Sequence, residues 1–73
     1  MNNWISVNDL LPKLEFENYS SRMVLIVVLD YDGTSFVDIG YRSKIYSSDI
    51  DTVWLDEHGA IVTVTHWQPL PEF

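Results

Sequence analysis

The feature that most constrains the fold is an unbroken apolar run, MVLIVVL, at residues 23–29. Four of its residues are Val or Ile, whose β-branched side chains pack well on a pleated surface and favour strands. The run is too short to cross a bilayer, which takes about 20 residues in a helix. Because both faces of such an extended run are apolar, it predicts a central strand buried on both sides.

A tight turn and a second strand follow this run. Asp32–Gly33 suits a hairpin turn because glycine accepts a positive φ. After the turn, apolar and polar residues alternate, as they do on a half-buried strand. One face carries the apolar set Val37, Ile39 and Tyr41. The other carries Asp38, Gly40 and Arg42. Residues 23–42 are therefore predicted to form an antiparallel hairpin.

A second hairpin is predicted at residues 52–67. Two apolar-rich segments, TVWL and AIVTVTHW, flank a turn at 56–59 that contains a glycine. Pro69 and Pro71 then end regular pairing, because proline offers no backbone N–H to a ladder.

The sequence as a whole predicts a single mainly β domain over residues 1–73, with little helix. The two hairpins and an N-terminal edge strand at 3–7 make an antiparallel sheet of four to five strands. Residues 13–21 are expected to be irregular. The sheet is either an open curled sheet or a small barrel.

A chain with a small core and no disulfide or zinc thiolate site gains stability from self-association. A core of this size supplies roughly 3–5 kcal/mol of net stability. The chain has no cysteine for disulfides or zinc thiolates, and it depends on the packing of three Trp, four Tyr and three Phe. A second subunit would cover an open face of the sheet, so a homodimer is expected.

The net charge restricts the classes of molecule that the protein can bind. Eleven Asp and Glu oppose four Lys and Arg, for a formal net charge of −7. Such a chain repels a phosphate backbone, so no direct nucleic-acid binding is expected. The first residues do not resemble a signal peptide, and we expect a cytoplasmic protein without a membrane partner. The acidic surface serves solubility alone, a protein partner with a basic surface, or mimicry of the charge of nucleic acid.

The two ends of the chain carry a family resemblance. The opening WISVNDLLP and the closing VTHWQPLPE are similar to the signatures of a short family found in tailed phages and prophages, the domain-of-unknown-function family five-fifty-one. The matching residues are Trp4, Ile5, Ser6, Val7, Asp9, Leu11, Pro12, Thr65, His66, Trp67, Pro69, Leu70, Pro71 and Glu72. The chain departs from the pattern at Gln68, where methionine is common. The resemblance implies a phage-type protein and no particular activity.

His66 and Trp67 admit a structural and a chemical interpretation. In the first, Trp67 folds onto the sheet near Trp4, and His66 donates a hydrogen bond to a carbonyl or an acidic side chain. The second is a metal site with four ligands, His58, His66, Asp49 and Asp51. The two histidines lie roughly 26 Å apart along a straight strand, so the first is favoured. The sequence predicts no metal, no cofactor and no enzyme.

The acidic stretch DIDTVWLDE at 49–57 is the candidate surface for a partner. Its members are Asp49, Asp51, Trp54, Asp56 and Glu57. The stretch is either a solvated loop that flanks a buried strand or a contact face, with an aromatic anchor rimmed by negative charge.

The expected function is that of a small acidic accessory protein of the phage type, which acts by binding another protein. Inhibition of a host-defence or nucleic-acid enzyme through the acidic surface is one version. An oligomer-forming assembly module is the alternative, and a small hydrolase or metal protein ranks last.

Overall fold

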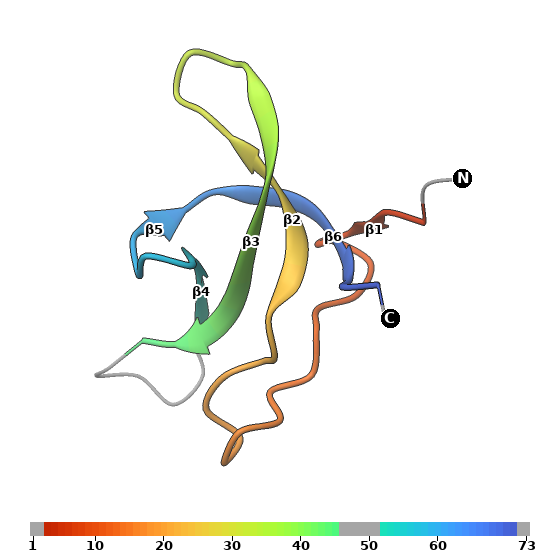
Figure 1. Ribbon diagram of the computed structural model, residues 1–73, viewed down its shortest axis with the longest axis vertical. Helices are drawn as coiled ribbons and strands as arrows, with labels where there is room; N and C mark the ends of the chain where they lie inside the picture. Colours follow the sequence, from red (N-terminus) through yellow and green to blue (C-terminus); the bar gives the residue numbers. More distant parts are fainter. Residues whose placement is uncertain (1–2, 46–51, 72–73) are drawn as a thin grey trace.

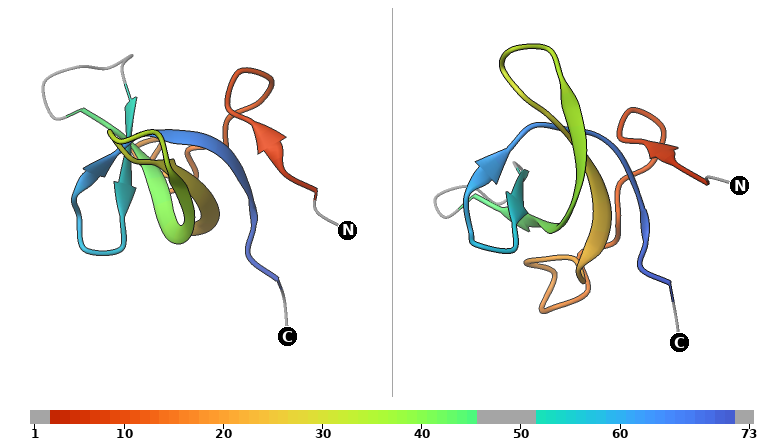
Figure 2. Two further views of the ribbon diagram at one scale, coloured as in Figure 1. Left: turned by 90° about the horizontal axis from the view of Figure 1, so that it is seen from above. Right: turned by 45° about the horizontal axis from the view of Figure 1, so that its top comes forward.

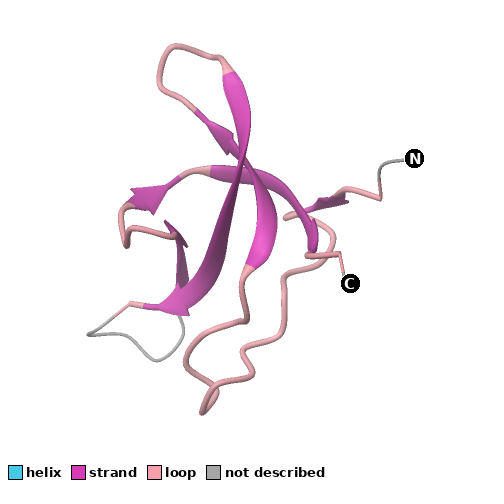
Figure 3. Cartoon of the chain, viewed as in Figure 1, coloured by secondary structure: helices cyan, strands magenta, loops and turns pink. Residues whose placement is uncertain are grey.

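A computed structural model describes residues 3–45 and 52–71, which form one curled sheet (Figure 1). Its six strands are β1 (Ile5–Ser6), β2 (Val24–Leu29), β3 (Ser35–Lys44), β4 (Thr52–Asp56), β5 (Ile61–Val62) and β6 (Val64–Pro69). The described residues contain strands and loops but no helix, and so no helix that could cross a membrane (Figure 3). The mainly β prediction is confirmed, with six strands instead of four to five.

Neighbouring strands are all antiparallel, in the order β1-β6-β2-β3-β4-β5. β5 stands at one end of this order, yet only Thr63 separates it from β6, which lies next to the opposite end. The sheet therefore curls, so that β5 comes near the start of β6, while β1 lies on the far side of the molecule from β5 (Figure 2). It remains an open sheet, with β1 and β5 as its edges.

The single strand predicted at residues 60–67 is in fact two strands. β5 pairs with β4, whereas β6 pairs with β2 and β1. The pairing of β6 with β2 also shifts register between Val27 and Val28. Twist accumulates from strand to strand, so one straight strand cannot stay beside both β4 and β2. The bend at Thr63 and the irregularity in register resolve this conflict.

The predicted central hairpin is confirmed as β2 and β3. Val27 faces Val37 across the ladder. At the turn, the Asp30 N–H donates to the Thr34 carbonyl at 2.8 Å, and Gly33 takes a φ of +91°. Glycine adopts this conformation without steric cost, so the turn can be tight.

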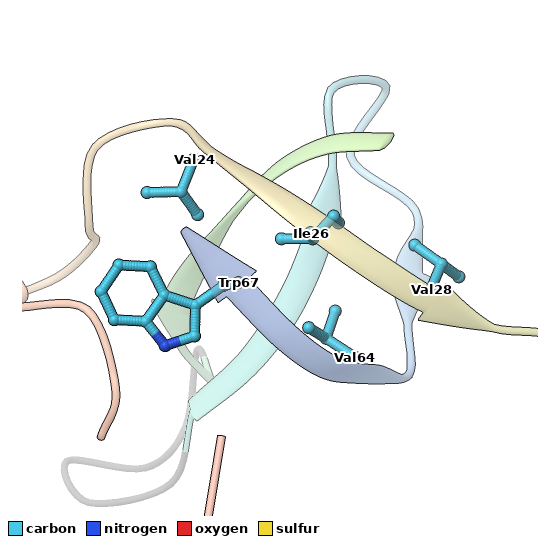
Figure 4. Close-up of a cluster of buried hydrophobic side chains, with 5 residues drawn as sticks. All are labelled: Val24, Ile26, Val28, Val64 and Trp67. Atoms are coloured by element: carbon cyan, nitrogen blue, oxygen red, sulfur yellow. The ribbon is translucent and has the colours of Figure 1, made fainter. Parts of the chain in front are cut away.

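The core lies on the inner face of the curl. Its buried side chains are Val24, Ile26, Val28, Val64 and Trp67 (Figure 4). Four partly buried residues pack against them, namely Ile5, Val7, Trp54 and Val62. All of these come from strands or from the loop that follows β1.

The prediction that β2 is buried on both sides is wrong. On its outer face Leu25 and Val27 are half-buried, and Leu29 is 40% exposed. The curl encloses the inner face only, and the described residues provide no second layer over the outer face. An apolar strand is therefore compatible with one covered face.

Residues 13–21, predicted to be irregular, contain a tight turn of their own. Glu17 and Asn18 both take positive φ values, 56° and 58°. The Tyr19 N–H closes the turn by donating to the Phe16 carbonyl at 2.8 Å. Asparagine tolerates this left-handed conformation, whereas glutamate adopts it rarely.

Gly40 is predicted to reject a side chain. A Cβ at this position would clash with the Leu55 carbonyl oxygen and approach Cδ1 of Ile26 to 2.6 Å. Gly40→Ala should therefore lower the free energy of unfolding by about 1–3 kcal/mol, the range for overpacking. Urea unfolding followed by circular dichroism measures the change. Ser35→Ala, at the exposed end of the same strand, is the control and should change it by less than about 0.5 kcal/mol. Equal losses in the two variants would contradict the prediction.

Candidate functional site

The two ends of the chain lie side by side at one edge of the sheet. β1 pairs with β6, which places Ile5 opposite Trp67. The Val7 N–H extends this contact by donating to the Thr65 carbonyl at 3.0 Å. The opening and closing segments of the sequence therefore form one structural unit.

Trp67 closes the core beneath the loop that follows β1. Its side chain is only 6% exposed, and Nε1 donates a hydrogen bond to the Leu10 carbonyl at 2.9 Å. A buried indole N–H requires such an acceptor. The prediction that Trp67 covers the core beside the N-terminal segment is confirmed.

Arg42 fixes the next part of the same loop. Its Nη1 donates to the carbonyl of buried Pro12 at 2.9 Å, and its Nε donates to Oγ1 of Thr52 at 3.0 Å. Partial burial lowers the pKa of Arg42, but a guanidinium titrates so high that it stays charged. The side chain thus links the N-terminal loop to β4.

A family model with the description "Protein of unknown function (DUF551)" matches residues 3–72. The chain belongs to this family. The match includes both terminal segments and confirms the resemblance that they carry. No curated protein and no solved structure matches the chain. For this DUF551 protein, the geometry shows that the terminal segments build the fold.

The role predicted for His66 is wrong. Its side chain is exposed, and Nδ1 lies 3.1 Å from Oγ1 of Thr65. Neighbours on a strand point to opposite faces, so the inward position of Trp67 places His66 on the outer face, beside Val27. The ring therefore bonds to a neighbouring hydroxyl instead of the expected carbonyl or acidic group.

The other signature residues frame the same edge. Trp4 is half-buried just before β1. Pro69 is the last residue of β6 and lies opposite Val24, while Pro71 is exposed beyond it. Their positions agree with the prediction that the prolines end regular pairing.

The predicted partner-binding stretch does not form one exposed face. Asp49 and Asp51 lie outside the described residues. Trp54 is half-buried and packs against the core, while Glu57 is exposed. An indole that packs inward is poorly placed to anchor a partner, because an anchor must enter a pocket on the other protein. Binding by this stretch remains a prediction, and it would depend on charge.

Asp56 has a structural task in the turn between β4 and β5. Its Oδ1 accepts hydrogen bonds from the backbone N–H groups of His58 and Ala60, each at 2.9 Å. Within residues 3–45 and 52–71 there is no pocket, and no three His, Cys, Asp or Glu side chains group as metal ligands would.

The structure shows a different exposed aromatic surface, at the end of the central hairpin. We call residues 29–38 the arm, because this end of β2 and β3 projects from the sheet (Figure 1). Tyr31 at the turn is fully exposed, and Phe36 is 49% exposed. From the sequence, this turn was predicted only as the connection between two strands. The available signal was the aromatic residue between two aspartates in the triplet DYD at 30–32.

The arm is uniformly acidic. Its carboxylates are Asp30, Asp32 and Asp38, and no Lys or Arg occurs between Arg22 and Arg42. Asp32 accepts hydrogen bonds from the side chain and the backbone N–H of Thr34, at 2.6 and 2.9 Å. These bonds lower the pKa of Asp32, so its carboxylate holds its charge. The arm therefore presents aromatic rings among fixed negative charges.

One edge of the arm is protected by its own side chain. β4 pairs with β3 only at residues 40–44, so among the described strands residues 35–39 have a neighbour on one side only. The Asp38 carboxylate accepts a hydrogen bond from the Ile39 N–H at 2.8 Å. A charge at the edge of a sheet hinders the addition of another strand.

Substitutions at the two neighbouring signature residues should have unequal effects. Trp67→Ala removes a buried aromatic side chain and should lower the free energy of unfolding by about 3–5 kcal/mol. That loss matches the whole stability expected of so small a core, so the variant should be largely unfolded. His66→Gln changes an exposed side chain and should alter stability by less than about 0.5 kcal/mol. Thermal unfolding of the two variants and the wild type measures these changes. A folded Trp67→Ala variant would show that the indole does not close the core.

The hydrogen bonds of Thr34 should set the pKa of Asp32. In the wild type, nuclear magnetic resonance should give Asp32 a pKa below the ordinary aspartate value of about 3.9. Thr34→Ala removes the side-chain bond, the largest cause, and should raise that pKa. Because the pKa of Asp32 is lower in the folded state, its charged carboxylate stabilises the fold at pH values above the ordinary aspartate pKa. This stabilisation is lost as the pH falls through the folded-state pKa. An unchanged pKa in Thr34→Ala would exclude this bond as the cause.

Proposed function

We propose that this DUF551 protein is a small acidic accessory protein, of the phage or prophage type, that binds another protein in the host cytoplasm. The observation that carries the proposal is the arm, in which a fully exposed tyrosine lies between two carboxylates. Tyrosine is a frequent anchor of protein interfaces, because its ring adds a large contact area and its hydroxyl a hydrogen bond.

The charge of the arm defines the partner. Three carboxylates without a neighbouring base favour a protein with a basic surface, and their attraction would speed association. Tyr31 and Phe36 would supply the buried contact at the centre, with the aspartates at the rim. An enzyme of host defence or nucleic-acid metabolism has such a basic groove, and an acidic arm in that groove would inhibit it. The same charge opposes direct binding of nucleic acid.

The aromatic anchor in this proposal is Tyr31, whereas the sequence predicted an anchor at Trp54. That indole packs against the core, whereas the ring of Tyr31 is free to enter a pocket on another protein. The partner class is the same, a protein with a basic surface. Asp56 and Glu57 add further negative charge from the β4–β5 turn.

Photo-crosslinking in a lysate of the host bacterium tests the proposal. Benzoylphenylalanine at position 31 should crosslink to one host protein with a basic surface, and high salt should reduce the yield. The control carries the same residue at position 19, where Tyr19 is 45% exposed in the loop before β2. This control should give no comparable product.

A charge variant provides the second arm of the experiment. Asp30→Asn with Asp32→Asn keeps the shape of the turn and removes two charges, so it should slow association with the captured protein by about tenfold or more. Identical products from positions 19 and 31, or products that persist unchanged in high salt, would exclude the arm as the binding surface. Crosslinks confined to a second copy of the chain would likewise contradict a basic partner.

A further inference from the structure

From β2 to β5 the outer face of the sheet is largely apolar, and at β6 it is bordered by His66 and Gln68, which lie opposite Val27 and Leu25. Across the ladders, Leu25 lies opposite Ile39 and Val27 opposite Val37, so these pairs share the outer face. The registers of the next strands extend it to β4 and β5. Its members are Leu25, Val27, Leu29, Val37, Ile39, Tyr41, Leu55 and Ile61. None of these side chains is buried, and Val37 and Ile61 are 59% and 72% exposed.

We propose that a second copy of this chain covers this outer face, so that two curled sheets pack face to face as a symmetric dimer. Two sheets in contact would convert one layer into the two-layer arrangement of ordinary β domains. The interface is isologous, because each copy contributes the same apolar patch.

Among the described strands, the absence of charged residues from the outer face favours a second copy of the chain as the molecule that covers it. The charged residues of the described strands occupy the positions that alternate with the outer-face residues, so their side chains belong to the inner side. They are Asp38, Arg42, Lys44 and Asp56. A chain with a net charge of −7 can therefore meet its copy here without bringing strand carboxylates together. A basic partner would find no carboxylate in these outer rows, whereas an apolar copy is complementary to them.

The accessible area of the protein is larger than that of a compact monomer of the same mass. The chain exposes 5415 Å², whereas a compact monomer of 8.5 kDa exposes roughly 4,650 Å². The projecting arm and the uncovered face both contribute to the excess. An interface of standard size would bury about 800 Å² on each copy. The centre of the patch is the Val27–Val37 pair, and the two-fold axis would pass near it.

The aromatic rings of the arm lie apart from the dimer face, although Leu29 and Val37 of the arm belong to that face. Phe36 projects to the inner side of β3, opposite Val28, whereas Val37 projects to the outer side. Dimerisation does not depend on the proposed basic partner, and the two proposals can fail independently.

Sedimentation equilibrium at low micromolar concentration tests the dimer. The wild type should sediment at twice 8.5 kDa. Val37→Glu places like charges near the axis and should raise the dissociation constant at least about tenfold, while circular dichroism stays native. Phe36→Glu is the matched control, with the same added charge on the neighbouring residue and the opposite face, and it should remain a dimer.

Ile61→Glu is a second variant of the outer face, at a position too exposed to disturb folding. It should also weaken the dimer. A wild type that sediments as a monomer, or a dimer that survives both outer-face variants, would overturn the proposal. Equal dissociation by Phe36→Glu would also overturn it, because the contact would then not be specific to the outer face.

Discussion

The indole of Trp67 joins three parts of the protein that are separate in sequence. It fills the inner face of the curl beside Ile26, its partner across the β2–β6 ladder, and it faces Ile5 of β1. Its N–H holds the loop after β1 through the Leu10 carbonyl. Because a single curled layer has a small interior, one large ring fills a substantial share of it. The short strand β1 could not hold the N-terminal segment in place with two residues alone.

Some of the fold could be predicted from local patterns. The alternation at Val37 and Ile39, with glycine at the turn, was enough to define the central hairpin and its faces. Trp67 was recognised as a core residue because prolines follow it and end the strand. These predictions succeed because strand periodicity and turn chemistry act over a few residues.

The parts that were missed depend on the arrangement of the whole sheet. Nothing near Thr63 in the sequence indicates that the chain changes neighbours there, since the bend results from accumulated twist. The apolar residues Leu25 and Val27 were expected to be buried, because a sequence pattern shows which faces are apolar but not which are covered. Similarly, the sequence did not indicate that the arm around Tyr31 extends beyond the end of β4, because this depends on where β4 pairs with β3.

The carboxylate of Asp38 has a consequence for the behaviour of the protein in a crowded cell. The arm combines apolar side chains with a strand edge that has no neighbour among the described strands, and such an edge is a template on which foreign chains can assemble into fibrils. By engaging the Ile39 N–H, Asp38 withdraws one of the donors that an incoming strand would need, and its charge repels other acidic chains. The side chains of the arm can therefore stay exposed while one backbone donor at its edge is already engaged.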